Sequence, residues 1–189
     1  MKHLIIYAHP YNGSFNHAIK EKVIEAIKAK GDSYELRDLY EMNFNPVLGA
    51  EELANVAKGI VSADVKKEQD YISDCDIITV IFPIWWSNSP AILKGYIDRV
   101  FSHGFAYQYT QKGPEGLLAG KKSVVISTHG AMEDQYQAIG MYESFQKTID
   151  MGIFQFCGME ILAHKYLGGA VASTPEIRES FLNEVAELY

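Results

Sequence analysis

The chain has 189 residues, of which 48% are hydrophobic and 22% charged, a composition typical of one globular domain with a sizeable core. Seventeen basic residues against 24 acidic ones give a net charge of -7 without any lysine–arginine cluster, which argues against nucleic-acid binding. No apolar run has the length of a membrane span or signal peptide, and Cys75 and Cys157 form no CxxC pair, so we expect a cytoplasmic protein with buried thiols.

Four mainly apolar stretches, and one short stretch of alternating polarity at residues 34–37, are separated by segments of helical periodicity. In chain order, we expect strands at residues 3–8, 34–37, 77–82, 121–128 and 159–164. We expect helices at residues 15–30, 63–75, 90–103, 138–150 and 175–188. Strands separated by helices predict an α/β fold whose parallel sheet is covered on both faces. Right-handed crossovers then predict a doubly wound five-stranded sheet of order 2-1-3-4-5, in one domain over residues 1–189.

In such a sheet, ligands bind beyond the carboxyl ends of the strands, beside the first strand. Three loops are expected to meet there, at residues 9–16, 83–89 and 127–136. The first loop, HPYNGSFN, carries Ser14 as a helix N-cap, while His9 and Asn16 add donors near a helix start that favours anions. An ordinary capped helix start explains the same residues. Neither the dinucleotide-binding G-x-G-x-x-G nor the phosphate-binding G-x-x-x-x-G-K-S/T pattern is present.

The other two loops carry aromatic and hydroxyl-bearing residues. Trp85 and Trp86 follow the third strand, where they indicate either surface packing or a platform for a planar ligand. The third loop is either a polar surface turn or a hydrogen-bonding edge, built from Ser127, Thr128, Gly130 and Tyr136. Taken together, the three loops suit a phosphorylated planar heterocycle, for which flavin is the natural candidate.

Competing chemistries find little support in the sequence. It contains no H-E-x-x-H motif, no paired-cysteine zinc spacing and no G-x-S-x-G nucleophile elbow. None of the six histidines has the spacing of metal ligands, so no metal site is predicted.

Six motifs occur in order along the chain: HP-x-x-x-SFN, DLYEMNFNP, FP-x-x-W, PAILKGYIDRVF, GFAYQY and FCGMEIL. Through them nearly the whole chain resembles the NAD(P)H:quinone oxidoreductase family of flavodoxin-like flavoproteins, in its shorter bacterial form. That family also includes modulator-of-drug-activity and potassium-efflux ancillary proteins. The resemblance implies bound FAD (or alternatively FMN), NAD(P)H as co-substrate, a quinone-like acceptor, a ping-pong mechanism and a homodimer.

The resemblance also implies roles for individual residues. Around the flavin phosphates it places His9, Ser14, Phe15 and Asn16. Near the dinucleotide part of FAD it places Gln69 and Arg178. Along the flavin ring and its edge it places Pro83, Ile84, Trp85, Trp86, Ser87, Ser127, Thr128 and Gly130. Across the dimer interface, lining the partner's acceptor site, it places Tyr107 and Tyr109.

Tyr136 is the candidate donor that stabilises negative charge during hydride transfer. The animal members of the family pair this tyrosine with a histidine, whereas Tyr142 stands at that position here, so Tyr142 or His129 is expected to assist. Trp85 and Ser87 also depart from the glutamine and phenylalanine of the family pattern.

Two other functions remain open at this point. One is a flavodoxin-type electron carrier, against which the aromatic GFAYQY segment argues, because a carrier needs no acceptor wall. We expect this segment to be a loop that exposes Phe105, Tyr107 and Tyr109. The other is a regulatory subunit of a potassium efflux system, associated with a membrane transporter.

Overall fold

The computed structural model describes all 189 residues, and its central element is a five-stranded parallel sheet. The strands lie in the order β2 (Ser33–Asp38), β1 (Lys2–Tyr7), β3 (Ile77–Pro83), β6 (Lys122–Thr128) and β7 (Glu160–Leu167). Every neighbouring pair is parallel. This is the order predicted from the alternation of strands and helices, and the doubly wound α/β fold is confirmed.

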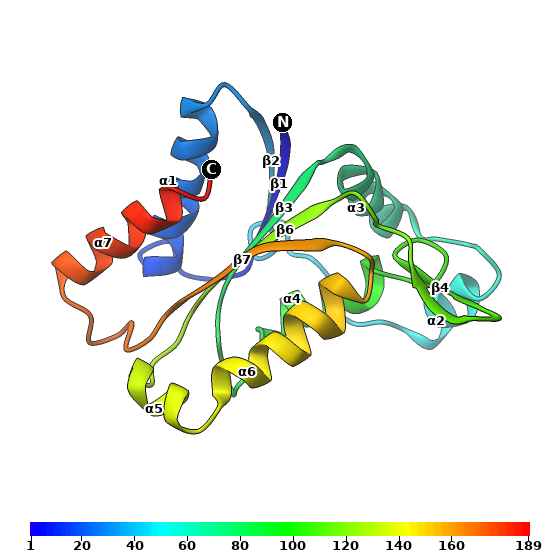
Figure 1. Cartoon of the computed structure of the whole chain (residues 1–189). Helices are drawn as coiled ribbons and strands as arrows, with labels where there is room; N and C mark the ends of the chain where they lie inside the picture. The colour runs from blue at the N-terminus through cyan, green and yellow to red at the C-terminus, as the bar shows by residue number, and fades with distance from the viewer.

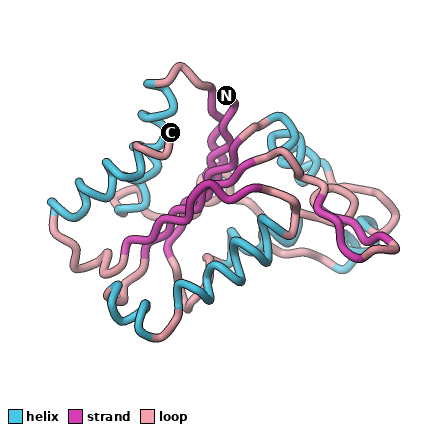
Figure 2. Tube along the Cα trace, viewed as in Figure 1, coloured by secondary structure: helices cyan, strands magenta, loops and turns pink.

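Helices cover the sheet on both faces (Figures 1 and 2). One face carries α1 (Phe15–Ala29) and α7 (Pro175–Ala186), which pack over a cluster of 14 buried apolar residues. The other carries α3 (Ala63–Asp74), α4 (Ala91–Val100), α6 (Met141–Phe145) and η1 (Gln146–Gln155), over a cluster of 24. Because both faces are covered, all seven residues of β3 are buried, as its run of β-branched and aromatic residues predicts.

The segment predicted as one helix at 138–150 differs in the structure. It follows a short helix, α5 (Glu133–Ala138), and continues from α6 into η1, a π-helix that ends at Gln155. The buried side chains Phe145, Ile149 and Phe154 lie four and five residues apart, a wider repeat than an α-helix uses. The wider winding turns all of them toward the sheet.

Besides α5, three elements were not predicted. The helix α2 (Ala50–Val56) has no buried residue, and the guanidinium of the buried Arg99 holds it by donating to both oxygens of Glu52 at 3.0 Å. The segment GFAYQY, expected to be a loop with three exposed aromatics, contains β4 (Tyr107–Thr110), which pairs with β5 (Gly113–Gly116). Phe105 and Tyr107 are only half-exposed there, because the hairpin folds against the body of the protein.

The two cysteines are buried and unpaired, as expected, and burial raises the pKa of each thiol to about 11. None of the helices combines the length and apolarity needed to cross a membrane.

Candidate active site

The carboxyl end of β6 joins the three loops that the sequence singled out. The Asn16 amide donates to the Thr128 hydroxyl at 2.8 Å, which ties the first loop to this strand end. The Ile84 amide donates to the Thr128 carbonyl at 2.7 Å, which ties the second loop to the same residue. The predicted convergence is therefore confirmed, at the end of the sheet where α5 and the segment after β7 lie in Figure 1.

The first loop offers hydrogen-bond donors at the start of α1. Ser14 caps the helix, its hydroxyl accepting from the His17 amide at 3.2 Å. The Tyr11 amide donates to Nδ1 of His9 at 3.1 Å, and burial lowers the pKa of His9. A neutral His9 whose Nδ1 accepts must carry its proton on Nε2. This loop thus presents backbone and imidazole N–H groups, the chemistry of an anion site.

The second loop is a tight turn that holds an indole outside the protein. Trp85 and Asn88 exchange backbone hydrogen bonds of 2.9 and 3.0 Å, enclosing Trp86 and Ser87. Both enclosed residues are left-handed, with φ of 51° and 58°, which is costly for residues other than glycine and is concentrated at functional sites. Trp86 is 100% exposed and Trp85 42%, whereas the Ile84 side chain is buried. Ile84 therefore offers the site only its backbone.

The third loop brings His129, Tyr136 and Tyr142 together. The Tyr136 ring stacks on His129 with centroids 4.4 Å apart and planes 17° from parallel. Nδ1 of His129 donates to the Ala131 carbonyl at 3.0 Å, so its Nε2 accepts from the Tyr142 hydroxyl at 3.1 Å. Burial lowers the pKa of His129 and raises that of Tyr142 to about 12, so both are neutral at pH 7.

The free energy of unfolding is expected to fall as the pH decreases from about 7 to about 5. Burial lowers the pKa of His3, His9 and His129 in the folded protein, so below the ordinary value of 6.5 the unfolded chain takes up more protons. Urea unfolding over this range should show a shallower pH dependence for His129→Gln, by at most about 1.4 kcal/mol per pH unit, the limit for one proton. Identical slopes for the variant and the wild type would contradict this.

The two residues placed near the dinucleotide part of FAD have different outcomes. Arg178 lies beside the first loop, its guanidinium 5.7 Å from the ring centre of Phe15 and its Nε donating to the Ser173 hydroxyl at 2.8 Å. The predicted place of Gln69 near the dinucleotide part of FAD does not fit the structure. Gln69 is buried between α3 and the end of α4, where its amide donates to the Val100 carbonyl and the Ser102 hydroxyl at 3.0 and 3.1 Å. That position is near the amino ends of the strands, away from the loops.

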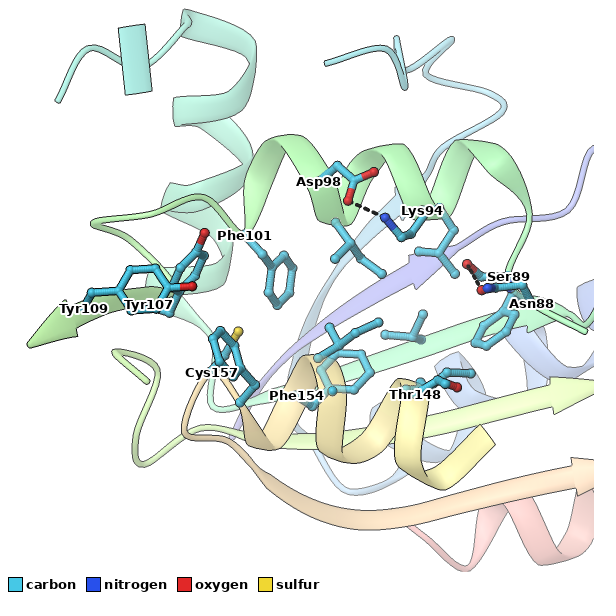
Figure 3. Close-up of a pocket in the computed structure, with 18 residues that line it drawn as sticks. Asn88, Ser89, Lys94, Asp98, Phe101, Tyr107, Tyr109, Thr148, Phe154 and Cys157 are labelled. Atoms are coloured by element: carbon cyan, nitrogen blue, oxygen red, sulfur yellow. Dashed lines mark hydrogen bonds and ion pairs between the residues drawn. The ribbon is translucent and has the colours of Figure 1, made fainter. Parts of the chain in front are cut away.

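Tyr107 and Tyr109 also lie apart from the three loops. They line one end of a groove of about 530 Å³ between α4 and η1, and Asn88 and Ser89 line its other end (Figure 3). Because α4 runs antiparallel to the strands, the tyrosines lie near the amino ends of the strands. Asn88, in contrast, belongs to the turn of residues 85–88 that carries Trp85 and Trp86 (the tryptophan turn). Within one chain, the tyrosines do not reach the candidate site.

Asp150 and His164 border the site and were missed from the sequence. They lie 2.7 Å apart on η1 and β7, next to Ser127. They stand fourteen positions apart in the chain, and no local motif links them, so only the fold brings them together. The structure shows no group of three or more histidine, cysteine, aspartate or glutamate side chains that could hold a metal ion.

Comparison with known proteins agrees with this geometry. The flavodoxin-like fold family matches residues 1–188. An uncharacterized NAD(P)H oxidoreductase of Haemophilus influenzae is 39% identical over 188 residues, covering 99% of this chain and 93% of the relative. NAD(P)H dehydrogenase (quinone) 1 of Rattus norvegicus is 32% identical over 199 residues, covering 95% of this chain and 73% of the relative.

A solved structure gives the same result. The NAD(P)H:quinone oxidoreductase of Methanothermobacter marburgensis superimposes with a TM-score of 0.87 at 32% identity, covering 99% of this chain and 94% of that one. The chain belongs to the flavodoxin-like family, in the group that includes the NAD(P)H:quinone oxidoreductases.

Proposed function

We propose that the chain is a flavin-dependent oxidoreductase that passes a hydride from NAD(P)H to a quinone or similar acceptor by a ping-pong mechanism. The observation that carries this proposal is the joining of all three loops at Thr128, beside the stacked pair His129 and Tyr136. The names of the relatives support the choice of electron donor and acceptor.

The residues at the site fit a flavin. The N–H groups at the start of α1 and on His9 suit its phosphate, and the exposed indole of Trp86 suits the edge of a planar ring. The Oδ1 atom of Asn16 is buried without a partner, and a hydroxyl of the polyol chain of a flavin would satisfy it. At Gly130 an added Cβ would meet nothing within 4 Å, so the backbone is open to a ligand. We favour FAD over FMN on the position of Arg178, since Gln69 no longer supports that choice.

When bound, a flavin supplies the chemistry of accepting and releasing hydride. The protein residues then position it and stabilise charge. We propose that Tyr136 directs its hydroxyl toward the region where negative charge develops, as a preorganised donor. His129 supports the Tyr136 ring by stacking, and Tyr142 fixes the His129 ring by donating to Nε2. In this arrangement, His129 takes the supporting place that the family resemblance gives to a histidine at position 142.

We further propose a homodimer in which Tyr107 and Tyr109 of one chain line the acceptor site of the other. Tyr109 is 68% exposed, and the groove beside it is lined mostly by apolar side chains. Large exposed apolar surfaces of this kind usually mark protein contacts. A two-fold contact over this groove would create two equivalent sites, each built from both chains.

The purified protein is expected to contain noncovalently bound flavin and to oxidise NAD(P)H with a simple quinone. Visible absorption shows the flavin, and chromatography after denaturation distinguishes FAD from FMN. Parallel double-reciprocal plots at several quinone concentrations would support the ping-pong mechanism. A colourless preparation that binds neither FAD nor FMN on titration would refute the proposal.

A further inference from the structure

A buried carboxylate–imidazole pair lies beside the candidate site but outside its three loops. The Oδ1 atom of Asp150, on η1, is 2.7 Å from Nδ1 of His164, on β7. The two side chains are 10% and 3% exposed. Because a carboxylate only accepts hydrogen bonds, Nδ1 of His164 carries a proton. The other ring nitrogen, Nε2, lies 3.4 Å from the hydroxyl of Ser127, at the end of β6.

Tyr166 and the winding of η1 hold this pair in place. The Tyr166 ring stacks on His164 with centroids 4.0 Å apart, and its hydroxyl lies 2.9 Å from Nδ1. Tyr166 also packs against Tyr142, with ring centroids 4.7 Å apart. Asp150 faces inward because η1 is π-helical, a winding that is rare and frequently found at functional sites. The pair is therefore held in a defined geometry and is linked by contacts to residues of the site.

The carboxyl end of β6 is held from both faces of the sheet. Successive side chains of a strand point to opposite faces, so the hydroxyls of Ser127 and Thr128 do the same. On the α1 face, Asn16 binds the Thr128 hydroxyl at 2.8 Å. On the η1 face, His164 meets the Ser127 hydroxyl. The residue that follows Thr128 is His129, whose ring belongs to the candidate site.

We propose that Asp150 and His164 are positioning residues that hold the end of β6, and with it His129, in the geometry the site requires. Asp150 orients the imidazole, and the imidazole holds the Ser127 hydroxyl, as a carboxylate orients a histidine in many other sites. The importance of this contact for catalysis rests on the proposed function. The contact itself is a property of the chain, and it can be tested without any cofactor.

Hydrogen–deuterium exchange of the purified protein tests the proposal directly. His164→Gln and Asp150→Ala are expected to speed exchange of the backbone amides of residues 127–131 about fivefold, the change for losing one ordinary hydrogen bond. Asp150→Asn keeps an acceptor for Nδ1 and is expected to restore exchange to within about twofold of the wild-type rate. Ser127→Ala removes the other end of the contact and should reproduce the effect of His164→Gln, so the test does not depend on one variant folding.

The matched control is His3→Gln. His3 is also buried, and its Nε2 lies 3.3 Å from the Asp32 carboxylate, but it stands at the amino end of β1. This variant should leave exchange of residues 127–131 unchanged. Unchanged exchange in His164→Gln and Ser127→Ala, or an equal increase in His3→Gln, would overturn the proposal. Because exchange is measured whether or not flavin binds, failure of the proposed function gives a different result.

Discussion

Replacing Tyr136 with phenylalanine is expected to slow reduction of the bound flavin by NAD(P)H about a hundredfold, the usual effect of losing one preorganised donor. The substitution keeps the ring that stacks on His129 and removes only the hydroxyl. Flavin should therefore stay bound, and the loss should appear in the rate of the chemical step rather than in the affinity for NAD(P)H. Stopped-flow absorption of the flavin measures that rate directly.

Three further variants make this measurement specific. Tyr142→Phe leaves Nε2 of His129 without its donor, and we expect a smaller loss, about tenfold, because the effect is indirect. His129→Gln removes the stacking surface beneath Tyr136 and should slow the step at least as much as Tyr142→Phe. Tyr34→Phe, on β2 and far from the loops, is the matched control and should change nothing. A wild-type rate in Tyr136→Phe would remove this hydroxyl from the mechanism.

Mixing two nearly inactive variants is expected to restore activity if the site is shared between chains. One variant is Tyr136→Phe, and the other is the double substitution Tyr107→Ala/Tyr109→Ala. In a mixed dimer, one site receives both defects and the other receives neither. With random exchange, half of the dimers are mixed, so activity should rise to about one quarter of that of the wild type.

The position of the tyrosines within one chain is the reason for this expectation. They lie at the opposite end of the groove from Asn88 and the tryptophan turn, so they cannot contact their own chain's loops without refolding of the hairpin (Figure 3). Mass spectrometry of differently tagged chains would confirm that subunits have exchanged. If exchange is complete and activity does not return, the tyrosines do not contribute to a partner's site.

Features that depend on the chain's own periodicity were predictable from the sequence. The buried apolar run before Pro83 and the alternation of strands with helices predicted the sheet order, because right-handed crossovers leave few topologies. The meeting of the loops followed from that order, since the carboxyl ends of parallel strands share one edge. The cap at Ser14 also depends only on local residues, and the structure confirms it.

Features that depend on contacts between distant segments were not predictable. Gln69 was placed near a flavin by resemblance alone. Its amide instead donates to the Val100 carbonyl at the end of α4, a contact that no local pattern reveals. The π-helical winding of η1 allows Phe145, Ile149 and Phe154 to be buried against the sheet together, and that burial depends on the neighbouring strands. The pairing of Asp150 with His164 depends in turn on that winding.

The turn at Trp86 and Ser87 has a consequence for the thermodynamics of binding. Two successive left-handed residues, closed by reciprocal hydrogen bonds between Trp85 and Asn88, leave the backbone few alternative conformations before any ligand arrives. Ordering a flexible loop around a ligand opposes binding through lost conformational entropy. Here most of that entropy is lost when the chain folds. In the proposed flavin complex, the free energy of contact with the indole would therefore contribute to affinity with little opposing loss from the loop backbone.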